Sequence, residues 1–355
     1  MAQKFSRTRT PSGLPALALG VMLGSAGTMT ATPAFAVDAE CAAAPEPVIS
    51  LNYGSRYTDD DDTRSTLDVD SNEVVNAALR PVDDFIRDLV ARSNGVLNES
   101  DPTSASGAAD CVLAQIATWA RADALSDLDS FTARLSMGAR IGAIAEAYRQ
   151  VRPLVTDLKA VADVDQWLIQ RAQEQLEFWE KEATSGARTG NLRAWAALAL
   201  LNIGEVTNTD TFVWWASASA VRILCTARED GSLPQETKRG SYGLHYQFHA
   251  LSPLVTIAAR LDRAGLPMTT SCNNALPRVV DYAFNDFEQE GALTQEYSGA
   301  RQSYFDGTET LEDHELAFLR AYVSLFPNSP LVDRAQKTEN LSNSKLGGDQ
   351  RLLWQ

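Results

Sequence analysis

Apolar residues recur at intervals of three and four positions along most of the chain, and this spacing is typical of amphipathic helices. The first helix is predicted from about residue 70 to 89, with Pro81 kinking or restarting it. Residues 94–109 are rich in Ser, Gly, Asp and Asn, which predicts a loop. Further helices are predicted over residues 111–125, 131–151, 164–185, 190–203, 210–229, 246–264, 274–288, 311–325 and 331–337.

The links between these helices are short, for example residues 204–208 and 264–267. Few stretches alternate as strands do, and only residues 345–354 are a candidate strand. No fixed-period repeat is visible, which argues against a regular solenoid. The pattern therefore predicts an all-α fold, an (α/α) toroid or incomplete barrel of helical hairpins. We expect a single domain over residues 37–355.

The N-terminal stretch has the composition of a secretory signal peptide. Lys4, Arg7 and Arg9 precede an apolar run over residues 14–26, and residues 34–36 (AFA) offer a small-residue cleavage site. A membrane anchor is the alternative, but the apolar run is too short to span a bilayer. We expect residues 1–36 to be removed and a soluble protein to be exported to the periplasm or secreted.

The net charge and the cysteine content indicate which binding partners and which cellular compartment to expect. The net charge of −15 becomes −18 without the three cations of the signal peptide, so no nucleic-acid partner is expected, because phosphate binding needs a basic face. The four cysteines fit an oxidising compartment. Of the three possible pairings, Cys41–Cys111 and Cys225–Cys272 are favoured, because each joins neighbouring segments. No membrane contact is expected, and a monomer is expected.

The stretch over residues 238–254 (KRGSYGLHYQFHALSPL) holds two of the three histidines of the chain. They flank Tyr246, and Arg239 lies seven positions before it. A free tyrosine has a pKa near ~10, so it acts as a base only where a cation or a hydrogen bond stabilises the phenolate. Helical spacing places His245, Tyr246 and His249 around one face. The alternative is that these residues only form an amphipathic helix wall.

Other candidate sites are weaker. His245 and His249 have the spacing of two metal ligands, but a third ligand is missing, so no metal is predicted. Asp230 and Glu236 flank a Gly-Ser turn and have the chemistry of a glycosidase pair, although a solvated turn explains them better. His314 is expected on the surface. Trp119, Trp195, Trp214 and Trp215 lie on predicted helices; most of them should be core, and one or two can stack on sugar rings.

In order and spacing, several segments resemble the helical-toroid alginate (poly-mannuronate) lyases. The stretch over residues 231–239 (GSLPQETKR), followed by Tyr246 and residues 250–254 (ALSPL), is similar to the family segment that contains its catalytic arginine and tyrosine. Asn191 and Trp195 match the family's Asn-Asn-His-x-Tyr-Trp element. Residues 111–125, 54–68 and 346–349 resemble an early helix, the mobile lid and the C-terminal end of the family.

The resemblance implies β-elimination on a β-1,4-linked uronan, an anionic polysaccharide, without a cofactor. Asn191 and Arg239 would bind the carboxylate of the cleaved sugar and stabilise the charge that develops there. Tyr246 would remove the C5 proton and then protonate the leaving O4. The substrate-binding residues would be Arg56, Tyr57 and Arg64 of the lid, together with Trp195 and Tyr242. The lid aspartates, residues 59–62, are expected to face solvent, because they repel a polyanion.

One position departs from the family pattern. The family has a catalytic histidine directly after the asparagine, where this chain has Leu192. His249, or else His245, is expected to replace it. The alternatives are a glucuronan or mixed-uronan lyase, a non-catalytic uronan-binding protein, and a glycoside hydrolase that uses Glu236.

Overall fold

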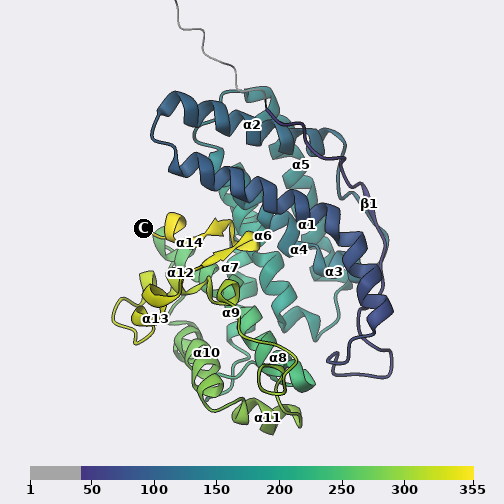
Figure 1. Ribbon diagram of the computed structural model, residues 1–355, viewed down its shortest axis with the longest axis vertical. Helices are drawn as coiled ribbons and strands as arrows, with labels where there is room; N and C mark the ends of the chain where they lie inside the picture. The colour runs from purple at the N-terminus through teal and green to yellow at the C-terminus, as the bar shows by residue number, and fades with distance from the viewer. Residues whose placement is uncertain (1–40) are drawn as a thin grey trace, which may run out of the picture. The chain divides into compact units, whose positions relative to one another are not determined.

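The computed structural model describes residues 41–355, so the predicted signal peptide, residues 1–36, lies outside the described residues (Figure 1). Helices make up almost all of the regular secondary structure in the described part. The α-helices are α1 (Val69–Asn98), α2 (Pro102–Arg121), α3 (Phe131–Ser136), α4 (Gly138–Val151), α5 (Leu158–Glu177), α6 (Asn191–Thr207), α7 (Asp210–Leu224), α8 (Pro234–Thr237), α9 (Gly243–Arg263), α10 (Ser271–Glu288), α11 (Ala292–Ser298), α12 (Leu319–Leu325), α13 (Val332–Lys337) and α14 (Gln350–Leu353).

Short irregular elements connect these helices. They are a π-helical turn (Phe178–Glu182) and 3-10 turns at Ala187–Thr189, Gly240–Tyr242, Ser303–Phe305, Asp313–Leu316 and Ser344–Leu346. Within residues 41–355 the strands are two-residue segments: β1 (Ser50–Leu51) pairs in parallel with β2 (Asp127–Leu128), and β3 (Ser342–Asn343) pairs antiparallel with β4 (Gly348–Asp349).

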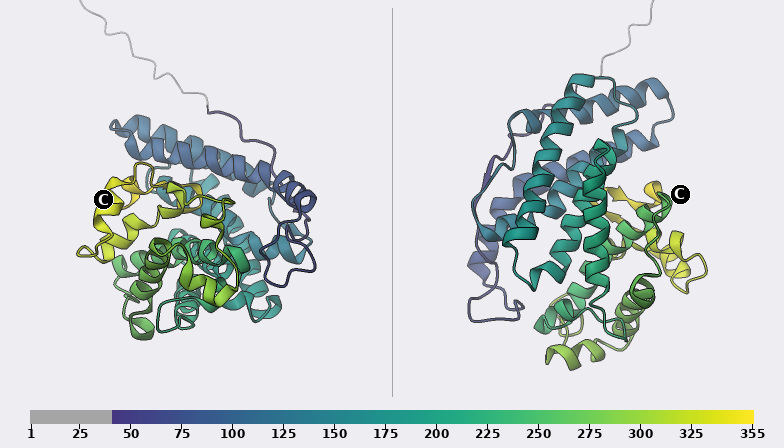
Figure 2. Two further views of the ribbon diagram at one scale, coloured as in Figure 1. Left: turned by 60° about the horizontal axis from the view of Figure 1, so that its bottom comes forward. Right: turned by 180° about the vertical axis from the view of Figure 1, so that it is seen from behind.

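The longer helices pack in two rows, which Figure 2 shows from two further sides. In the inner row, α4 packs against α1 and α6, and α9 packs against α6 and α12. In the outer row, α2 packs against α5 and α7 against α10. Successive helices link the rows, as α1 does with α2, α6 with α7 and α9 with α10. This arrangement of hairpins confirms the all-α prediction.

Helix α6 joins two hydrophobic cores. Leu198 and Leu201 pack in the core formed mainly by α7, α9 and α10, whereas Leu200 and Ile203 pack in the core of α1, α2, α4 and α5. Because α6 is apolar on every side, it can lie in the middle of the protein with both faces covered. Gly138 allows the closest approach to α6, since a Cβ there would lie 2.7 Å from the Cα of Ala196.

The structure changes several predicted boundaries. The loop predicted over residues 94–109 is wrong, because α1 continues to Asn98 and α2 begins at Pro102. The carboxylate of Asp101 caps α2 by accepting from the N–H of Ser104, and Pro102 stands at the first turn. The small polar residues of this stretch therefore mark a cap and a helix instead of a long loop. Helix α1 also runs through Pro81 without a break.

Two disulfides join the predicted pairs. Cys41 is bonded to Cys111, which ties the first described residue to α2, and Cys225 is bonded to Cys272 between α7 and α10. The described helices include none that is long and apolar enough to cross a membrane.

Candidate active site

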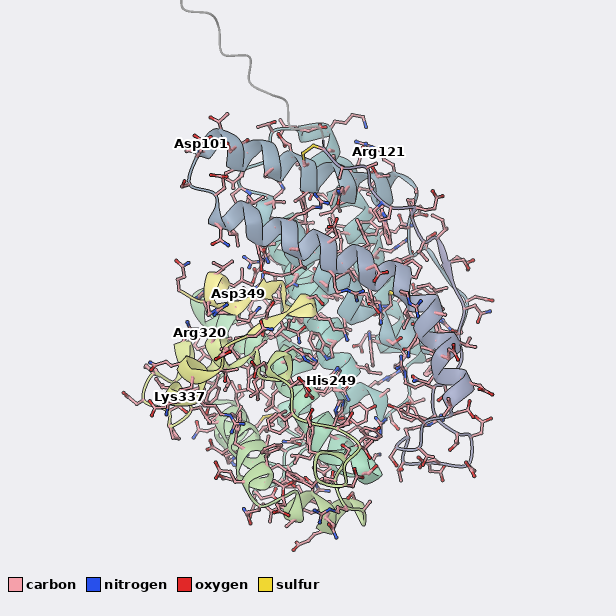
Figure 3. The ribbon with its side chains drawn as sticks, viewed as in Figure 1. Asp101, Arg121, His249, Arg320, Lys337 and Asp349 are labelled. Atoms are coloured by element: carbon pink, nitrogen blue, oxygen red, sulfur yellow. A yellow bond between two sulfur atoms is a disulfide. The ribbon has the colours of Figure 1, made fainter. Side chains whose placement is uncertain are left out.

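A cleft of about 1050 Å³ runs along the inner row of helices. Its walls come from α1, α6 and α9, and from two C-terminal segments around residues 308–315 and 342–345. His249 of α9 lies on this wall and is labelled near the middle of the view in Figure 3. The other lining residues include Asp83, Arg87, Asn94, Trp195, His245, Ser252, Glu309, Glu312, His314, Glu315 and Lys345.

Tyr246 lies one turn before His249 on α9, and its phenol is covered by the loop over residues 54–68. The hydroxyl of Tyr57 contacts the hydroxyl of Tyr246. The guanidinium of Arg239 lies over the Tyr246 ring, 3.9 Å from its centroid. The fold therefore brings Tyr57, Arg239 and Tyr246 together at the N-terminal end of α9.

The electrostatic balance at Tyr246 keeps its phenol protonated in this state. Burial raises the pKa of Tyr246 well above its usual value, and the nearby Arg239 opposes that rise without cancelling it. The hydroxyl of Tyr57 adds to the increase. Arg239 does lower the pKa of Tyr246, as expected from the sequence, but the increase caused by burial is larger.

Arg239 also fastens the covering loop. Its Nε donates to the carbonyl oxygen of Thr63 at 2.7 Å, and its Nη2 donates to the carbonyl oxygen of Arg64 at 2.8 Å. The expected lid over residues 54–68 thus lies closed on Arg239 and Tyr246.

The charged side chains of this loop do not all point where the sequence suggested. Arg56 donates to the side chain of Asn72 at 3.0 Å, and Arg64 is exposed and donates to Ser55 at 3.0 Å. The expectation that all four aspartates face solvent is wrong for Asp61. Its carboxylate accepts from the backbone N–H groups of residues 63, 65 and 66 and so holds the loop in shape.

His249 makes its protein contacts through one ring nitrogen. Nδ1 lies 3.1 Å from Oδ1 of Asn191 and 3.3 Å from Nε1 of Trp195. Burial lowers the pKa of His249 well below its usual value, and the ammonium of Lys345 and the neighbouring His245 and Arg239 add to this decrease. The imidazole is therefore neutral near pH 7. Its ring lies 6.2 Å, centroid to centroid, from that of Tyr246.

Leu192 lies away from this arrangement. Its side chain packs against the small hydrophobic cluster that contains Phe178, Trp179 and Ala196. The histidine nearest to Asn191 is therefore contributed by α9 instead of α6.

His245 belongs to a different group of side chains on the cleft wall. Its Nδ1 lies 3.2 Å from Glu309 and 3.7 Å from Glu315. Glu315 also accepts from the hydroxyl of Tyr304 at 2.6 Å. His245 thus faces carboxylates, whereas His249 faces an amide and an indole. Tyr242 packs edge-on against His245, with ring centroids 5.6 Å apart.

Glu236 is a residue whose position the sequence did not indicate. The prediction of a solvated turn is wrong for Glu236, which is 0% exposed. Its two carboxylate oxygens accept from the backbone and side-chain nitrogens of Asn191 at 2.7 and 2.6 Å. Burial raises the pKa of Glu236 to about 7, while these bonds and the nearby Arg239 and Lys238 oppose the increase. Asp230 is exposed and accepts from Ser232 and Tyr297.

Lys345 is a second cleft residue that was not predicted from the sequence. It lines the cleft, and within residues 41–355 its ammonium forms no ion pair. Burial lowers the pKa of Lys345 to about 8. It stands 99 positions after Tyr246, so no local pattern could have linked the two.

The remaining predicted residues divide between core and surface. Trp195 is 2% exposed, so only its edge reaches the cleft, and Trp214 is 60% exposed. His314 is exposed at the mouth of the cleft. Among residues 41–355 no three His, Cys, Asp or Glu side chains are arranged to hold a metal ion.

Comparisons with known proteins agree on one family. The family model described as alginate lyase matches residues 135–292. An alginate lyase of Pseudomonas syringae pv. tomato is 27% identical over 318 residues, which cover 87% of this chain and 81% of that protein. An alginate lyase of Pseudomonas aeruginosa is 26% identical over 340 residues, covering 94% of this chain and 87% of its own.

Solved structures share the fold. The crystal structure of alginate lyase A1-III from Sphingomonas species A1 has a TM-score of 0.70 at 22% identity and covers 90% of this chain and 87% of its own. A variant of alginate lyase A1-III in complex with a tetrasaccharide has a TM-score of 0.75 at 21% identity, covering 88% and 85%. The helical-toroid prediction is confirmed by this likeness.

Proposed function

We propose that this chain is an alginate lyase, the family to which the comparisons point, and that it cleaves poly-β-D-mannuronate by β-elimination in the cleft along α9. The observation that carries this proposal is the grouping of Tyr246 and Arg239 beside His249, which lines the cleft, with the guanidinium 3.9 Å from the tyrosine ring. A phenol, a cation and a neutral imidazole are the groups that this elimination requires.

In the proposed reaction, Tyr246 first transfers its phenolic proton to Nε2 of His249. The phenolate oxygen then removes the C5 proton of the sugar, the C5–H electrons form the C4=C5 double bond, and the C4–O4 bond breaks. Tyr246 finally passes the proton it took from C5 to the leaving O4, and His249 then returns its proton to the phenolate. Because C5–H and O4 lie on the same ring face in mannuronate, one phenol serves both steps.

Arg239 is proposed to bind the carboxylate of the cleaved sugar, where negative charge develops after proton removal. Its guanidinium is held by carbonyl oxygens of the loop, so the loop must release it when substrate enters. The amide of Asn191 is already engaged by Glu236 and His249. We therefore propose that Asn191 acts on His249 and not directly on the sugar, which departs from the sequence expectation.

Within residues 41–355 one unpaired cation in the cleft, Lys345, supports an anionic polymer as substrate, although four carboxylates also line the cleft. Lys345 presents an ammonium without an ion-pair partner in the described part of the chain, next to His249. We propose that it contacts a uronate carboxylate, and that Arg56, Tyr57 and Arg64 make further contacts from the loop. Glucuronan stays a second candidate substrate, because glucuronate differs from mannuronate only at C2.

We also propose that the protein works outside the cytoplasm. The support is the signal-peptide pattern of residues 1–36 together with two disulfides that use all four cysteines. No cofactor is required by the proposed chemistry.

The test uses the mature protein with poly-mannuronate, poly-guluronate and glucuronan, and follows the ultraviolet absorbance of the unsaturated ends. We expect turnover on poly-mannuronate, reduced by a factor of about 10²–10⁴ in Tyr246→Phe, which removes the proton-transfer group. Binding without turnover on all three polymers would select a non-catalytic binding protein. Saturated reducing ends as products would select a glycoside hydrolase.

A further inference from the structure

Glu236 holds Asn191 at two points. The first bond, from the backbone N–H of Asn191, caps α6, because Gly190 at the N-cap has no side chain to do so. The second bond, from Nδ2 of Asn191, is not needed for a cap. Gly190 allows the approach, since a Cβ there would lie 3.3 Å from Oε1 of Glu236.

The second bond determines which way the Asn191 amide faces. A carboxylate only accepts hydrogen bonds, so Nδ2 must point to Glu236 and Oδ1 must point away from it. Oδ1 then lies 3.1 Å from Nδ1 of His249. An amide oxygen also only accepts, and it therefore favours a proton on Nδ1.

Trp195 favours the opposite tautomer. Its indole N–H only donates, and it points at the same Nδ1 from 3.3 Å. A neutral imidazole satisfies one of these two neighbours and not both. The orientation of the Asn191 amide, and through it Glu236, decides between the two tautomers.

We propose that Glu236 is a positioning residue that, through Asn191, keeps the proton of the neutral His249 ring on Nδ1 and the lone pair of Nε2 free. Within residues 41–355 Nε2 makes no hydrogen bond, and the ring lines the cleft. The consequence for catalysis rests on the proposed lyase function, because the free Nε2 is the atom that accepts the Tyr246 proton. The tautomer itself does not depend on that function.

The direct test is nitrogen NMR of the histidine rings in Glu236→Gln. The glutamine amide is the same size as the carboxylate but donates from one arm. It should donate to Oδ1 of Asn191, turn that amide over, and present Nδ2 to His249. We expect a proton on Nδ1 in the wild type above the pKa of Glu236, and on Nε2 in the variant.

The chain has three histidines, so the signals can be assigned with His245→Asn and His314→Asn. Asp286→Asn is the matched control, because Asp286 is also 0% exposed and accepts from the backbone of α11 at Leu293 and Thr294. It should leave the His249 tautomer unchanged. The same tautomer in the wild type and in Glu236→Gln would overturn the proposal.

Asn191→Ala provides a second route if Glu236→Gln does not fold. Without the amide oxygen, only the indole of Trp195 faces Nδ1, and the proton is expected on Nε2. A proton that stays on Nδ1 in Asn191→Ala would also overturn the proposal.

Steady-state kinetics test the positioning role of Glu236 separately, because a purely structural role would not change kcat alone. In Glu236→Gln we expect kcat on poly-mannuronate to fall about tenfold or more while KM stays the same, because no sugar contact is removed. A raised KM with unchanged kcat would contradict the positioning role. If the wild type itself gives no unsaturated product, the lyase function fails while the NMR result still decides the tautomer.

Discussion

In the proposed reaction, Tyr246 and His249 are the two groups that exchange a proton. Burial raises the pKa of Tyr246, which suits a phenol that must protonate a leaving oxygen but opposes its action as a base. Burial and nearby cations lower the pKa of His249, so its ring is neutral near pH 7, although the same decrease makes it a weaker proton acceptor. The two shifts have opposite signs and the same main cause, which is removal from water.

The titration of Glu236 gives a pH prediction. Burial raises its pKa from 4.5 to about 7 in the folded protein, so folding favours the protonated form. This stabilisation is complete below about pH 4.5 and is lost as the pH rises through about 7. The groups that face Glu236 are Asn191 from α6, Tyr246 from α9, and Arg239 and Lys238 that follow it in the chain.

We expect the stability of the wild type relative to Glu236→Gln to fall by about 3 kcal/mol between about pH 4.5 and about pH 8. Urea unfolding of both proteins across this range measures the difference, in which the other titrating groups cancel. A difference that does not change with pH would show that Glu236 titrates as it does in water.

Among the secondary-structure elements, the loop over residues 54–68 shows how composition can mislead. Its run of four aspartates reads as a solvated segment, and residues 59, 60 and 62 are indeed exposed. Asp61 instead accepts three backbone hydrogen bonds and lets Thr63 and Arg64 present their carbonyl oxygens to Arg239. One carboxylate thus shapes the loop that covers Tyr246.

The packing of α4 on α6 depends on a missing side chain. A Cβ at Gly138 would meet the backbone of Ala196 at 2.7 Å, so Gly138→Ala must push the two helices apart. We expect a loss of about 1–3 kcal/mol in the free energy of unfolding, measured with urea.

Gly95→Ala in α1 is the matched control for that substitution. Gly95 is exposed, and nothing lies within 4 Å of the added methyl group. Alanine there should stabilise the protein by up to about 1 kcal/mol, because it favours the helix. Equal effects of the two substitutions would argue against close packing at Gly138.

At the scale of the described chain, inner helices of the double row line the cleft that contains His249. Inner helices α1, α6 and α9 supply its walls, and the C-terminal segment closes one side with Lys345. A net charge of −15 repels a polyanion at long range, so binding has to come from cations placed within the cleft.

The disulfides stabilise the two halves of the described chain separately. Cys41–Cys111 closes 70 residues at the N-terminal side, and Cys225–Cys272 closes 47 residues between α7 and α10. Replacing either pair with serines should lower the free energy of unfolding by about 2–4 kcal/mol. Thermal unfolding with and without a reductant measures this, and an unchanged melting temperature after reduction would count against it.

Local patterns were sufficient for much of this protein. Apolar spacing predicted the inner helices α6 and α9, because a helix face is encoded within one or two turns. The same spacing placed Tyr246 and His249 on one side of α9. The stretch over residues 94–109 was missed, because its small polar residues occur in loops and in capped helices alike.

The sequence by itself determined the all-α class and favoured the two disulfide pairs, and with the family resemblance it proposed Asn191, Arg239, Tyr246 and His249 as site residues. Only the tertiary structure decided that Glu236 is buried against Asn191, that Tyr57 covers Tyr246, and that Lys345 enters the cleft. These contacts join residues 45 to 189 positions apart. No local periodicity records such pairs, because burial and the direction of a hydrogen bond arise only when the helices pack.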